Sequence, residues 1–362
     1  MLSLMPRGIL FFRLSFFTSP QQVQGLPFAT QHIRSSQNPR EVHAADFPSG
    51  ATTEDQLKFL VNYAVLAPSV HNTQPWLFRV LDHTVEIYAD RSRALPVTDP
   101  EDRSLVVSCG SCVHLFCETL KAFGFNASCS IVPDMSDPDL MARITVQKRS
   151  ANATIDEDLV RAIVSRNTIR RGFLNLPLPT PFMELFTRNS DWMPSSVCTI
   201  DDSEEEALIF AQLKKTEKEH RNDIHYRRES DLWMHPMRAR SRDGVPMPPE
   251  AENPVESCWN AEDLNEEATL LAAITEPQDN PRAWLQTGED LMRVLLKGAS
   301  LGVNAAIMNL PPESEAVRAQ VSETINCSDV PILLLRFGRP RRKLVTPRRS
   351  PVDVMLHPGF RH

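Results

Sequence analysis

Three polar clusters in this chain have residue types and spacing that suit a ligand-binding site. The first runs from residue 67 to 76 and reads Ala-Pro-Ser-Val-His-Asn-Thr-Gln-Pro-Trp. Its two prolines, Pro68 and Pro75, fix the backbone φ angle and disfavour helix around them. Hydroxyl and amide groups that both donate and accept hydrogen bonds are supplied by Ser69, Asn72 and Gln74. We expect a rigid turn with an exposed amide pair, suited to the polar rim of a planar heterocycle.

The other two clusters are rich in arginine. One reads Arg-Asn-Thr-Ile-Arg-Arg from Arg166 to Arg171 and follows an apolar, helix-like stretch from Ile155 to Val164. The other reads Thr-Pro-Arg-Arg-Ser-Pro from Thr346 to Pro351. Planar guanidinium groups bind phosphate oxygens in pairs, and flanking prolines reduce the entropy lost when the arginines are held in place. Both clusters are candidates for a phosphate-binding site.

Each cluster also has a purely structural interpretation. The first could be a turn that buries Trp76, and an arginine cluster alone is more often a solvated helix end. His71 is at least as well explained as a turn residue, and we assign it no catalytic role. The cysteines at 109, 112 and 117 lie on the apolar stripe of a helix, where cysteine acts as a small hydrophobic residue. His220, Asp223, His225 and His235 lack a recognised metal-ligand spacing, so we predict no metal site.

Two long amphipathic helices are predicted to position these clusters. Apolar residues recur with helical spacing from Leu105 to Phe123 and again from Trp284 to Leu301, and a glycine follows each stretch. A shift of 178 residues superimposes the two stretches without a gap. It pairs Gly110 with Gly288, Gly124 with Gly302, Asn126 with Asn304, Ala127 with Ala305 and Pro133 with Pro311. Short strands are predicted after each helix, at 144–146 and 331–337. The pattern indicates an internal duplication whose halves pack as a pseudo-dimer within one chain.

The expected boundaries follow from this duplication. Residues 1–50 form an N-terminal extension, 51–150 the first half and 151–356 the second half, with an insertion at about 204–260. The acidic run at 204–206 is typical of a helix N-terminus, and the Pro- and Arg-rich stretch at 237–253 is a candidate lid. Residues 1–40 contain four arginines and no acidic residue, which resembles a transit peptide or an overextended start.

Composition favours small-molecule chemistry. The net charge of -7, with acidic and basic residues interspersed, argues against a nucleic-acid partner. No apolar run reaches the roughly 18 residues of a membrane span, so we expect no membrane-spanning segment. The seven cysteines are scattered, as in proteins with reduced thiols. We therefore expect a cytoplasmic protein, with organellar targeting by residues 1–40 left open.

The order of these motifs is similar to that of the FMN-dependent nitroreductase family, and in particular to its tandem-domain, Acg-like subgroup. The similarity runs from about Glu54 to Leu356. It implies an α+β nitroreductase-like fold in which two tandem half-units form the interface that holds FMN. It also implies one complete flavin site, because only one set of motifs is present, divided between the halves. The chain would be a monomer with an internal pseudo-dimer, or a homodimer.

The resemblance also implies roles for individual residues. The phosphate motif of the family matches Arg166, Asn167, Thr168 and Arg170, and its C-terminal arm matches Arg348 or Arg349. The loop that approaches the flavin ring and ribityl chain matches Pro68, Ser69, Asn72 and Gln74. The backbone beside the ring matches Gly302 and Val303. Such a protein takes hydride from NAD(P)H and passes it by a ping-pong mechanism to a nitro-aromatic, quinone or similar small-molecule acceptor. It needs no side-chain acid or base, because the flavin N5 atom carries the chemistry.

Two departures from the family pattern keep a second function open. Asn167 stands where the motif often has Arg or His, which removes one positive charge. The turn after the second long helix, at 302–306, has less glycine than close approach to a ligand favours. The altered turn and the long insertion over the presumed site motivate the alternative, a protein that binds and sequesters FMN without significant turnover.

Overall fold

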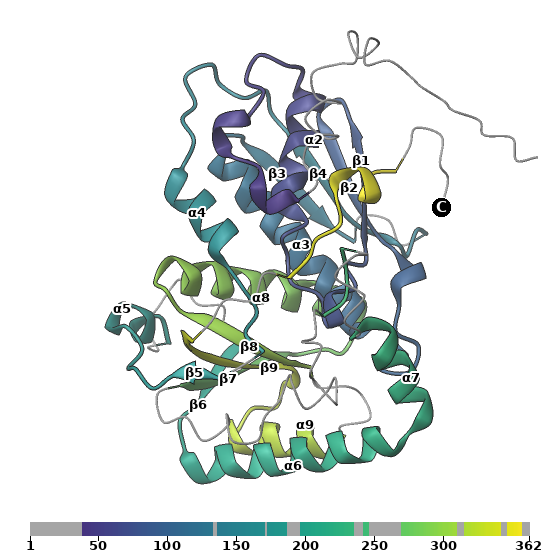
Figure 1. Cartoon of the computed structure of the whole chain (residues 1–362), viewed down its shortest axis with the longest axis vertical. Helices are drawn as coiled ribbons and strands as arrows, with labels where there is room; N and C mark the ends of the chain where they lie inside the picture. The colour runs from purple at the N-terminus through teal and green to yellow at the C-terminus, as the bar shows by residue number, and fades with distance from the viewer. Residues whose placement is uncertain are drawn as a thin grey trace, which may run out of the picture.

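The described residues form two halves joined by a pair of long helices (Figure 1). The computed structural model describes residues 38–132, 136–170, 172–186, 196–234, 242–245, 269–309, 315–341 and 346–356. The first half is drawn above the second in Figure 1, and the joining helices α3 (Arg103–Ala122) and α8 (Pro281–Ser300) lie between the two sheets. Both halves mix helices with antiparallel strands, so the expected α+β class is confirmed.

The first half is a four-stranded antiparallel sheet covered by helices. Its strand order is β1 (Trp76–Leu81), β2 (Thr84–Ala89), β4 (Leu140–Val146) and β3 (Ala127–Ile131). Helices α2 (Thr53–Ala64) and α3 bury their apolar residues in the same core as the inward side chains of this sheet. The strand predicted at 144–146 is the end of β4, whereas the polar strand β3 carried no apolar alternation that could reveal it.

The second half repeats this plan. Its strands lie in the order β6 (Val197–Ile200), β7 (Leu270–Glu276), β9 (Val330–Pro340) and β8 (Asn304–Asn309), and β5 (Phe173–Leu174) pairs with the end of β9. If β6, β7, β8 and β9 are equated with β1, β2, β3 and β4, the two sheets have the same order. The central helix stands between the second and third strands of each set in the chain. This repetition of topology fits the tandem arrangement predicted from the 178-residue shift.

Helices α3 and α8 contact each other at Gly110 and Gly288, a pair that the 178-residue shift superimposes. A Cβ atom added to Gly110 would lie 2.1 Å from the backbone oxygen of Leu285, and one added to Gly288 would lie 2.1 Å from the backbone oxygen of Val107. Ser111 Oγ also donates a hydrogen bond to the Gly288 oxygen across the contact, at 3.0 Å. The two backbones can approach this closely only because neither glycine has a side chain.

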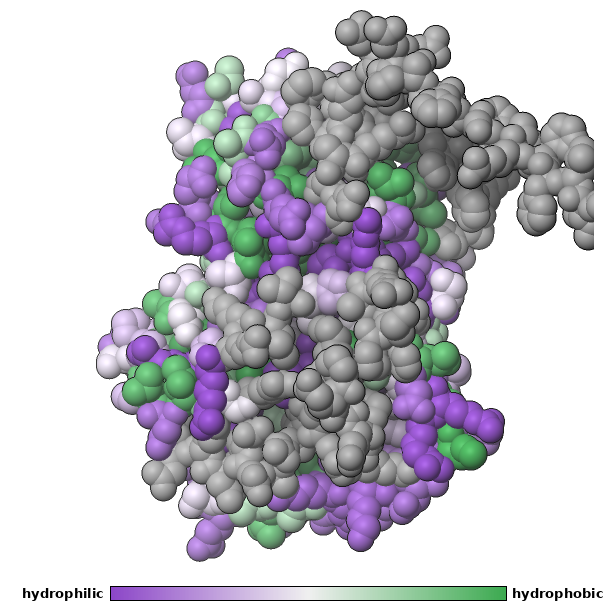
Figure 2. Space-filling view, viewed as in Figure 1, coloured by the Kyte–Doolittle hydropathy of each residue, from purple (hydrophilic) through white to green (hydrophobic). Residues whose placement is uncertain are grey.

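One continuous core includes buried residues of both halves, and a second, smaller core lies under the insertion. In the smaller core the outer face of the second sheet packs on α6 (Ser203–Asn222) and α9 (Glu315–Thr324). The acidic run at 204–206 lies in the first turn of α6, and the insertion continues into a second helix, α7 (Ile224–Trp233). Helix α6 lies along the lower edge of the molecule, where the surface in Figure 2 is mainly hydrophilic.

The N-terminal boundary at residue 50 needs correction for the residues that the structure describes. Short 3-10 turns form at η1 (Pro39–Glu41) and η2 (Ala44–Asp46). Phe47 is buried against the rings of Phe59, Phe123 and Phe125. Residues 38–50 therefore belong to the first half, because they complete its aromatic core. The targeting prediction concerns residues 1–40, of which residues 1–37 lie outside the described part of the chain.

Helix α3 also bears on the membrane prediction. It is long and apolar enough to pass a compositional test for a membrane span, but 78% of its most apolar window is buried inside the protein. Cys109 and Cys112 are fully buried on this helix, as expected of small hydrophobic residues in a core. The composition of α3 is that of a central core helix.

Candidate functional site

The loop between α2 and β1 is held in an unusual backbone conformation. His71, Asn72 and Gln74 have positive φ angles of 43°, 55° and 53°, which residues with a side chain rarely adopt. The hydroxyl of Ser69 stabilises the loop by accepting a hydrogen bond from the Gln74 backbone N–H at 2.9 Å. Three strained residues in a single turn persist only where surrounding contacts fix them, and such clusters are common at functional sites.

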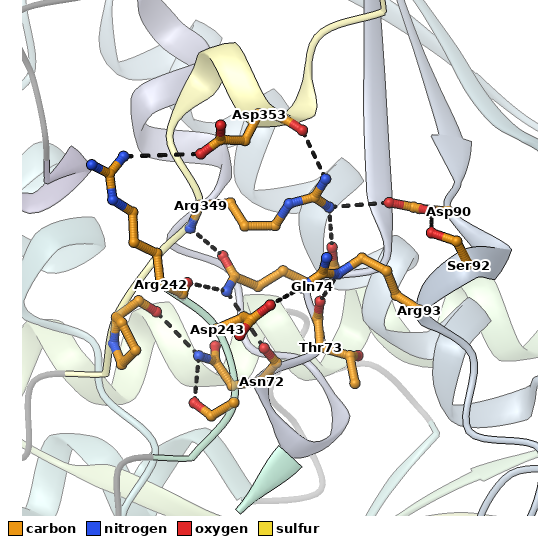
Figure 3. A network of polar contacts seen from close by, with 12 residues as sticks. Asn72, Thr73, Gln74, Asp90, Ser92, Arg93, Arg242, Asp243, Arg349 and Asp353 are labelled. Atoms are coloured by element: carbon orange, nitrogen blue, oxygen red, sulfur yellow. Dashed lines mark hydrogen bonds and ion pairs between the residues drawn. The ribbon is translucent and has the colours of Figure 1, made fainter. Parts of the chain in front are cut away.

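The amide pair of this loop is buried, so the expectation of an exposed pair is wrong. Asn72 is 2% exposed and Gln74 is fully buried. The Nδ2 atom of Asn72 donates to the Gly244 oxygen at 2.9 Å and to the Pro347 oxygen at 3.1 Å. The Nε2 atom of Gln74 donates to the Arg242 oxygen at 2.9 Å (Figure 3). The amides thus connect the loop to two distant segments of the chain.

The first of these segments, residues 242–245, is fastened to the loop by further contacts. The backbone N–H of Gly244 donates to the Asn72 oxygen at 3.1 Å. Arg93 donates to the Thr73 oxygen and forms an ion pair with Asp243 (Figure 3). Its guanidinium also lies over the ring of Trp233. Residues 242–245 of the insertion therefore bind directly to the turn that contains His71, Asn72 and Gln74, which we call the strained turn. The candidate lid at 237–253 includes this segment. The other residues of the candidate lid lie outside the described part of the chain.

The second segment is the C-terminal arm, and the structure separates its two arginines. The backbone N–H of Arg349 donates to Gln74 Oε1 at 2.8 Å, and its guanidinium bonds the Gln74 oxygen at 2.9 Å, Asp90 Oδ2 at 3.2 Å and the Asp353 oxygen at 2.7 Å (Figure 3). These partners occupy much of the hydrogen-bonding capacity of the group. Of the two candidates in the arm, Arg349 is thus the one with an evident structural role.

The side chain of Arg348 lies apart from that of Arg349 and shares a backbone acceptor with Arg166. Arg348 donates to Asn72 Oδ1 at 2.8 Å, and both arginines donate to the Leu66 oxygen, at 3.2 Å from Arg348 and 2.9 Å from Arg166. Arg348 is 4% exposed and Arg166 is 1% exposed. Among the residues that the structure describes, the buried Nε atom of each has no hydrogen-bond partner. Both guanidinium groups therefore retain unused donors inside the protein.

The charges around this pair are positive. Burial, followed by the charges of the nearby guanidinium groups of Arg40 and Arg170, lowers the pKa of Arg166 to about 9. Burial likewise lowers the pKa of Arg348, as do the charges of Arg40, Arg166 and Arg170. We call Arg40, Arg166, Arg170 and Arg348 the arginine cluster. Like charges repel strongly in a site of low dielectric constant, so a bound anion would stabilise the cluster.

The segment that carries two of these arginines is anchored to the second sheet. The backbone N–H of Asn167 donates to Asn304 Oδ1 at 2.9 Å, and the N–H of Ile169 donates to the Ala305 oxygen at 2.9 Å. Thr168 forms an isolated parallel bridge with Ala305, and its hydroxyl accepts from Arg166 Nη1 at 3.3 Å. The end of α4 (Glu157–Ser165) and the start of β8 thus hold the cluster from the second half.

Gly302 and Val303 have structural roles in the described contacts. Gly302 has a φ angle of 74° and ends α8, and its N–H donates to the Ala299 oxygen at 3.2 Å. Val303 is fully buried in the main core. Their predicted position beside a flavin ring stays a prediction. Asn304, the residue after them, contributes to the site by binding the backbone of Asn167, in the segment that carries Arg166 and Arg170 (the arginine segment).

His71 lies beside the arginine cluster and is uncharged at neutral pH. Burial, followed by the positive charge of Arg170, lowers its pKa to about 4. Its Nε2 atom is buried without a partner among the described residues. Sequence reasoning placed His71 in the loop but could not show that an arginine from the other half lies near it.

Other residues of the site could not be recognised from the sequence. Arg40 was set aside with the N-terminal extension, and Asp90, Arg93 and Asp243 belong to no motif. Each contributes through a contact between segments far apart in the chain. Arg171 and His235 lie outside the described residues. Within the described part of the chain, no group of three or more His, Cys, Asp or Glu side chains is arranged to hold a metal ion.

Three curated proteins of Mycobacterium tuberculosis are similar to most of this chain. The "Putative NAD(P)H nitroreductase acg" is 27% identical over 327 residues, which cover 86% of this chain and 98% of the relative. A second protein named "Putative NAD(P)H nitroreductase" is 29% identical over 307 residues, covering 81% of this chain and 86% of the relative. An uncharacterized protein is 28% identical over 327 residues, covering 83% and 92%. No family model matches the chain.

Solved structures of single nitroreductases match part of the chain at low similarity. The FMN-dependent nitroreductase NfnB of Mycobacterium smegmatis, in complex with NADPH, is 14% identical with a TM-score of 0.39, and the match covers 56% of this chain and 98% of that one. A protein of Desulfovibrio desulfuricans described as a "putative nitroreductase in complex with FMN" is 14% identical with a TM-score of 0.33, and the match covers 56% of this chain and 98% of that one. The curated relatives match over most of their own length and confirm the resemblance carried by the motifs: the chain is similar to the acg protein and to a second protein named putative NAD(P)H nitroreductase.

Proposed function

We propose that this protein is an FMN-dependent NAD(P)H oxidoreductase of the nitroreductase type. The observation that carries the proposal is the arginine cluster, in which buried guanidinium groups from both halves converge with unused Nε donors. A phosphate monoester fits such a site, because it carries up to two negative charges and three oxygens that accept hydrogen bonds. The names of the curated relatives supply the reductase class.

The described residues divide the work of holding the cofactor. Arg166, Arg170 and Arg348 would bind the phosphate, and Thr168 would orient Arg166 through its hydroxyl. Pro68, Ser69, Asn72 and Gln74 would shape the wall of the site, because the buried amides fix the strained turn rather than pointing into solvent. When bound, FMN would supply the hydride chemistry, accepting hydride from NAD(P)H and passing it to a nitro-aromatic, quinone or similar acceptor. The chain itself needs to bind, orient and exclude water.

Arginine substitutions test this assignment in the full-length protein. We expect the purified protein to be yellow and its absorbance to be bleached by NADPH or NADH. Arg170→Ala and Arg348→Ala should each weaken FMN binding by about one to two decades, since a charge-assisted hydrogen bond contributes about 1.5 to 3 kcal/mol. Arg161→Ala is the matched control, because Arg161 is an exposed arginine of α4 paired with Asp158. A colourless protein that FMN cannot reconstitute, or full FMN retention by both variants, would contradict the proposal.

A second function, FMN binding without turnover, is favoured by one specific observation. The 242–245 segment of the insertion is bonded to the two amides of the strained turn, so this face of the turn is covered. A covered site would hold flavin and slow its reaction with NAD(P)H or an acceptor. Steady-state NAD(P)H oxidation with menadione or nitrofurazone distinguishes the two functions. Rapid turnover with either acceptor rules out sequestration, and stable flavin with no oxidation rules out the reductase.

A further inference from the structure

Arg40 reaches the arginine cluster from outside every motif recognised in the sequence. It lies in η1, which precedes α2, and its Nη1 atom donates to the Val164 oxygen in the last turn of α4 at 2.9 Å. Val164 stands two residues before Arg166, so the bond places the Arg40 side chain beside the start of the arginine segment. The bond also ties a segment of the first half to a helix of the second.

The rest of the Arg40 guanidinium has no structural partner. Its Nε and Nη2 atoms are buried without a hydrogen-bond partner among the described residues. Its charge acts on both Arg166 and Arg348, which lowers the pKa of each. Two orphaned donors beside three other guanidinium groups cost stability, because each buried donor loses its bonds to water. An anionic ligand would satisfy these donors.

We propose that the segment before α2 is part of the ligand site, with Arg40 as a fourth guanidinium group that contacts the phosphate monoester. This inference rests on the proposed function for the identity of the ligand, but it assigns a residue that lies outside the matched motifs. Arg40 bonds the phosphate end of the ligand and makes no contribution to holding the ring. Its effect therefore separates FMN from riboflavin, which lacks the phosphate.

The same contact couples ligand binding to the N-terminal segment. Residues 38–47 are held by the Val164 bond, by a hydrogen bond from the Tyr63 hydroxyl to the Val42 oxygen at 3.3 Å, and by the burial of Phe47. A phosphate that bonds Arg40 adds a further attachment near the start of this segment. FMN then slows hydrogen exchange of residues 38–47, and riboflavin leaves it unchanged.

Binding measurements on the full-length protein test the inference. Wild type, Arg40→Ala, Arg40→Lys and Arg161→Ala are titrated with FMN and with riboflavin by flavin fluorescence. We expect Arg40→Ala to raise the Kd for FMN about tenfold or more and to leave the Kd for riboflavin unchanged. Arg40→Lys should fall between wild type and Arg40→Ala, because an ammonium keeps the charge but not the planar pair of donors. Arg161→Ala should match wild type.

The possible failures are distinguishable. An unchanged Kd for FMN in Arg40→Ala overturns the inference, and an equal loss of FMN and riboflavin assigns Arg40 a structural role and overturns it too. If wild type binds neither flavin, the proposed function fails, and thermal shifts with inorganic phosphate decide the inference alone. The inference is supported if phosphate raises the melting temperature of wild type but not that of Arg40→Ala. It is overturned if phosphate raises the melting temperature of both proteins, or if wild type shows no shift. Should Arg40→Ala fail to fold, Arg40→Lys and the exchange of residues 38–47 provide the same test.

Discussion

Arg349 forms a buried ion pair with Asp90, whereas we propose that its neighbour Arg348 binds the ligand. The side chains of Asp90 and Arg349 are 11% and 10% exposed, and Arg349 also bonds the Gln74 backbone. Breaking a buried ion pair leaves an uncompensated charge and costs about 3 to 5 kcal/mol. Arg349→Ala should therefore lower the free energy of unfolding by about 3 kcal/mol in urea denaturation while changing FMN affinity less than Arg348→Ala does. Asp90→Asn is the partner variant, and a double-mutant cycle isolates the pair. Equal flavin loss in Arg348→Ala and Arg349→Ala would contradict this division.

Glu276 is the residue whose titration should be visible in stability. It is 8% exposed at the end of β7, and burial, followed by the charge of Asp290, raises its pKa to about 7. The ordinary value is 4.5, so between pH 4.5 and 7 the folded state keeps a proton that the unfolded state releases. The stability that this protonated group contributes is full below pH 4.5 and falls as the pH rises through 7.

Glu276→Gln should remove that part of the pH dependence, because the amide stays neutral at every pH. We expect the variant to lose less stability than wild type between pH 5 and pH 8 when unfolding is followed by circular dichroism. Glu101→Gln, at an exposed position, is the control. The same slope in wild type and Glu276→Gln would show that Glu276 is already ionised at pH 5.

At the level of elements, regular apolar patterns in the sequence predicted helices and strands well, whereas contacts between distant segments could not be predicted. The helices α3 and α8 and the strand β9 have strong apolar periodicity or long apolar runs, and all lie where the sequence placed them. The edge strand β3 is mostly exposed, so it had no pattern to detect. The burial of Asn72 and Gln74 could not be predicted either, because the segments that cover them lie about 170 and 275 residues further along the chain.

The contact of α3 with α8 gives a prediction at this scale. Gly110→Ala places a methyl group against the backbone of Leu285, which cannot move aside as a flexible side chain could. Forcing the helices apart should lower the free energy of unfolding by about 3 kcal/mol, at the upper end of the usual cost of overpacking. Gly50→Ala is the matched control, because nothing lies within 4 Å of the added atom. Equal stability of the two variants would mean that the helices pack less closely than the structure shows.

Across the whole molecule, the candidate site combines segments from both halves. The strained turn comes from the first half, the arginine segment from the second, and the C-terminal arm crosses back to the first half, where the backbone of Leu356 bonds Phe78. The paired glycines at 110 and 288 were visible in the sequence as a repeat, yet only the structure shows that they touch each other. Arg40 was missed for the same reason, since a single residue outside a repeat carries no signal of what it approaches.

This architecture predicts that the two halves unfold together. The main core includes residues of α2, α3, α8 and both sheets, so neither half can separate without exposing the apolar faces of α3 and α8. Calorimetry should show one transition, and hydrogen exchange should give α3 and α8 similar and high protection. In the proposed site FMN contacts both halves, so FMN at 100 times its Kd should stabilise the whole transition by about 2.7 kcal/mol. Two transitions, only one of them shifted by FMN, would show that the halves are separate domains and that the flavin is held by one of them.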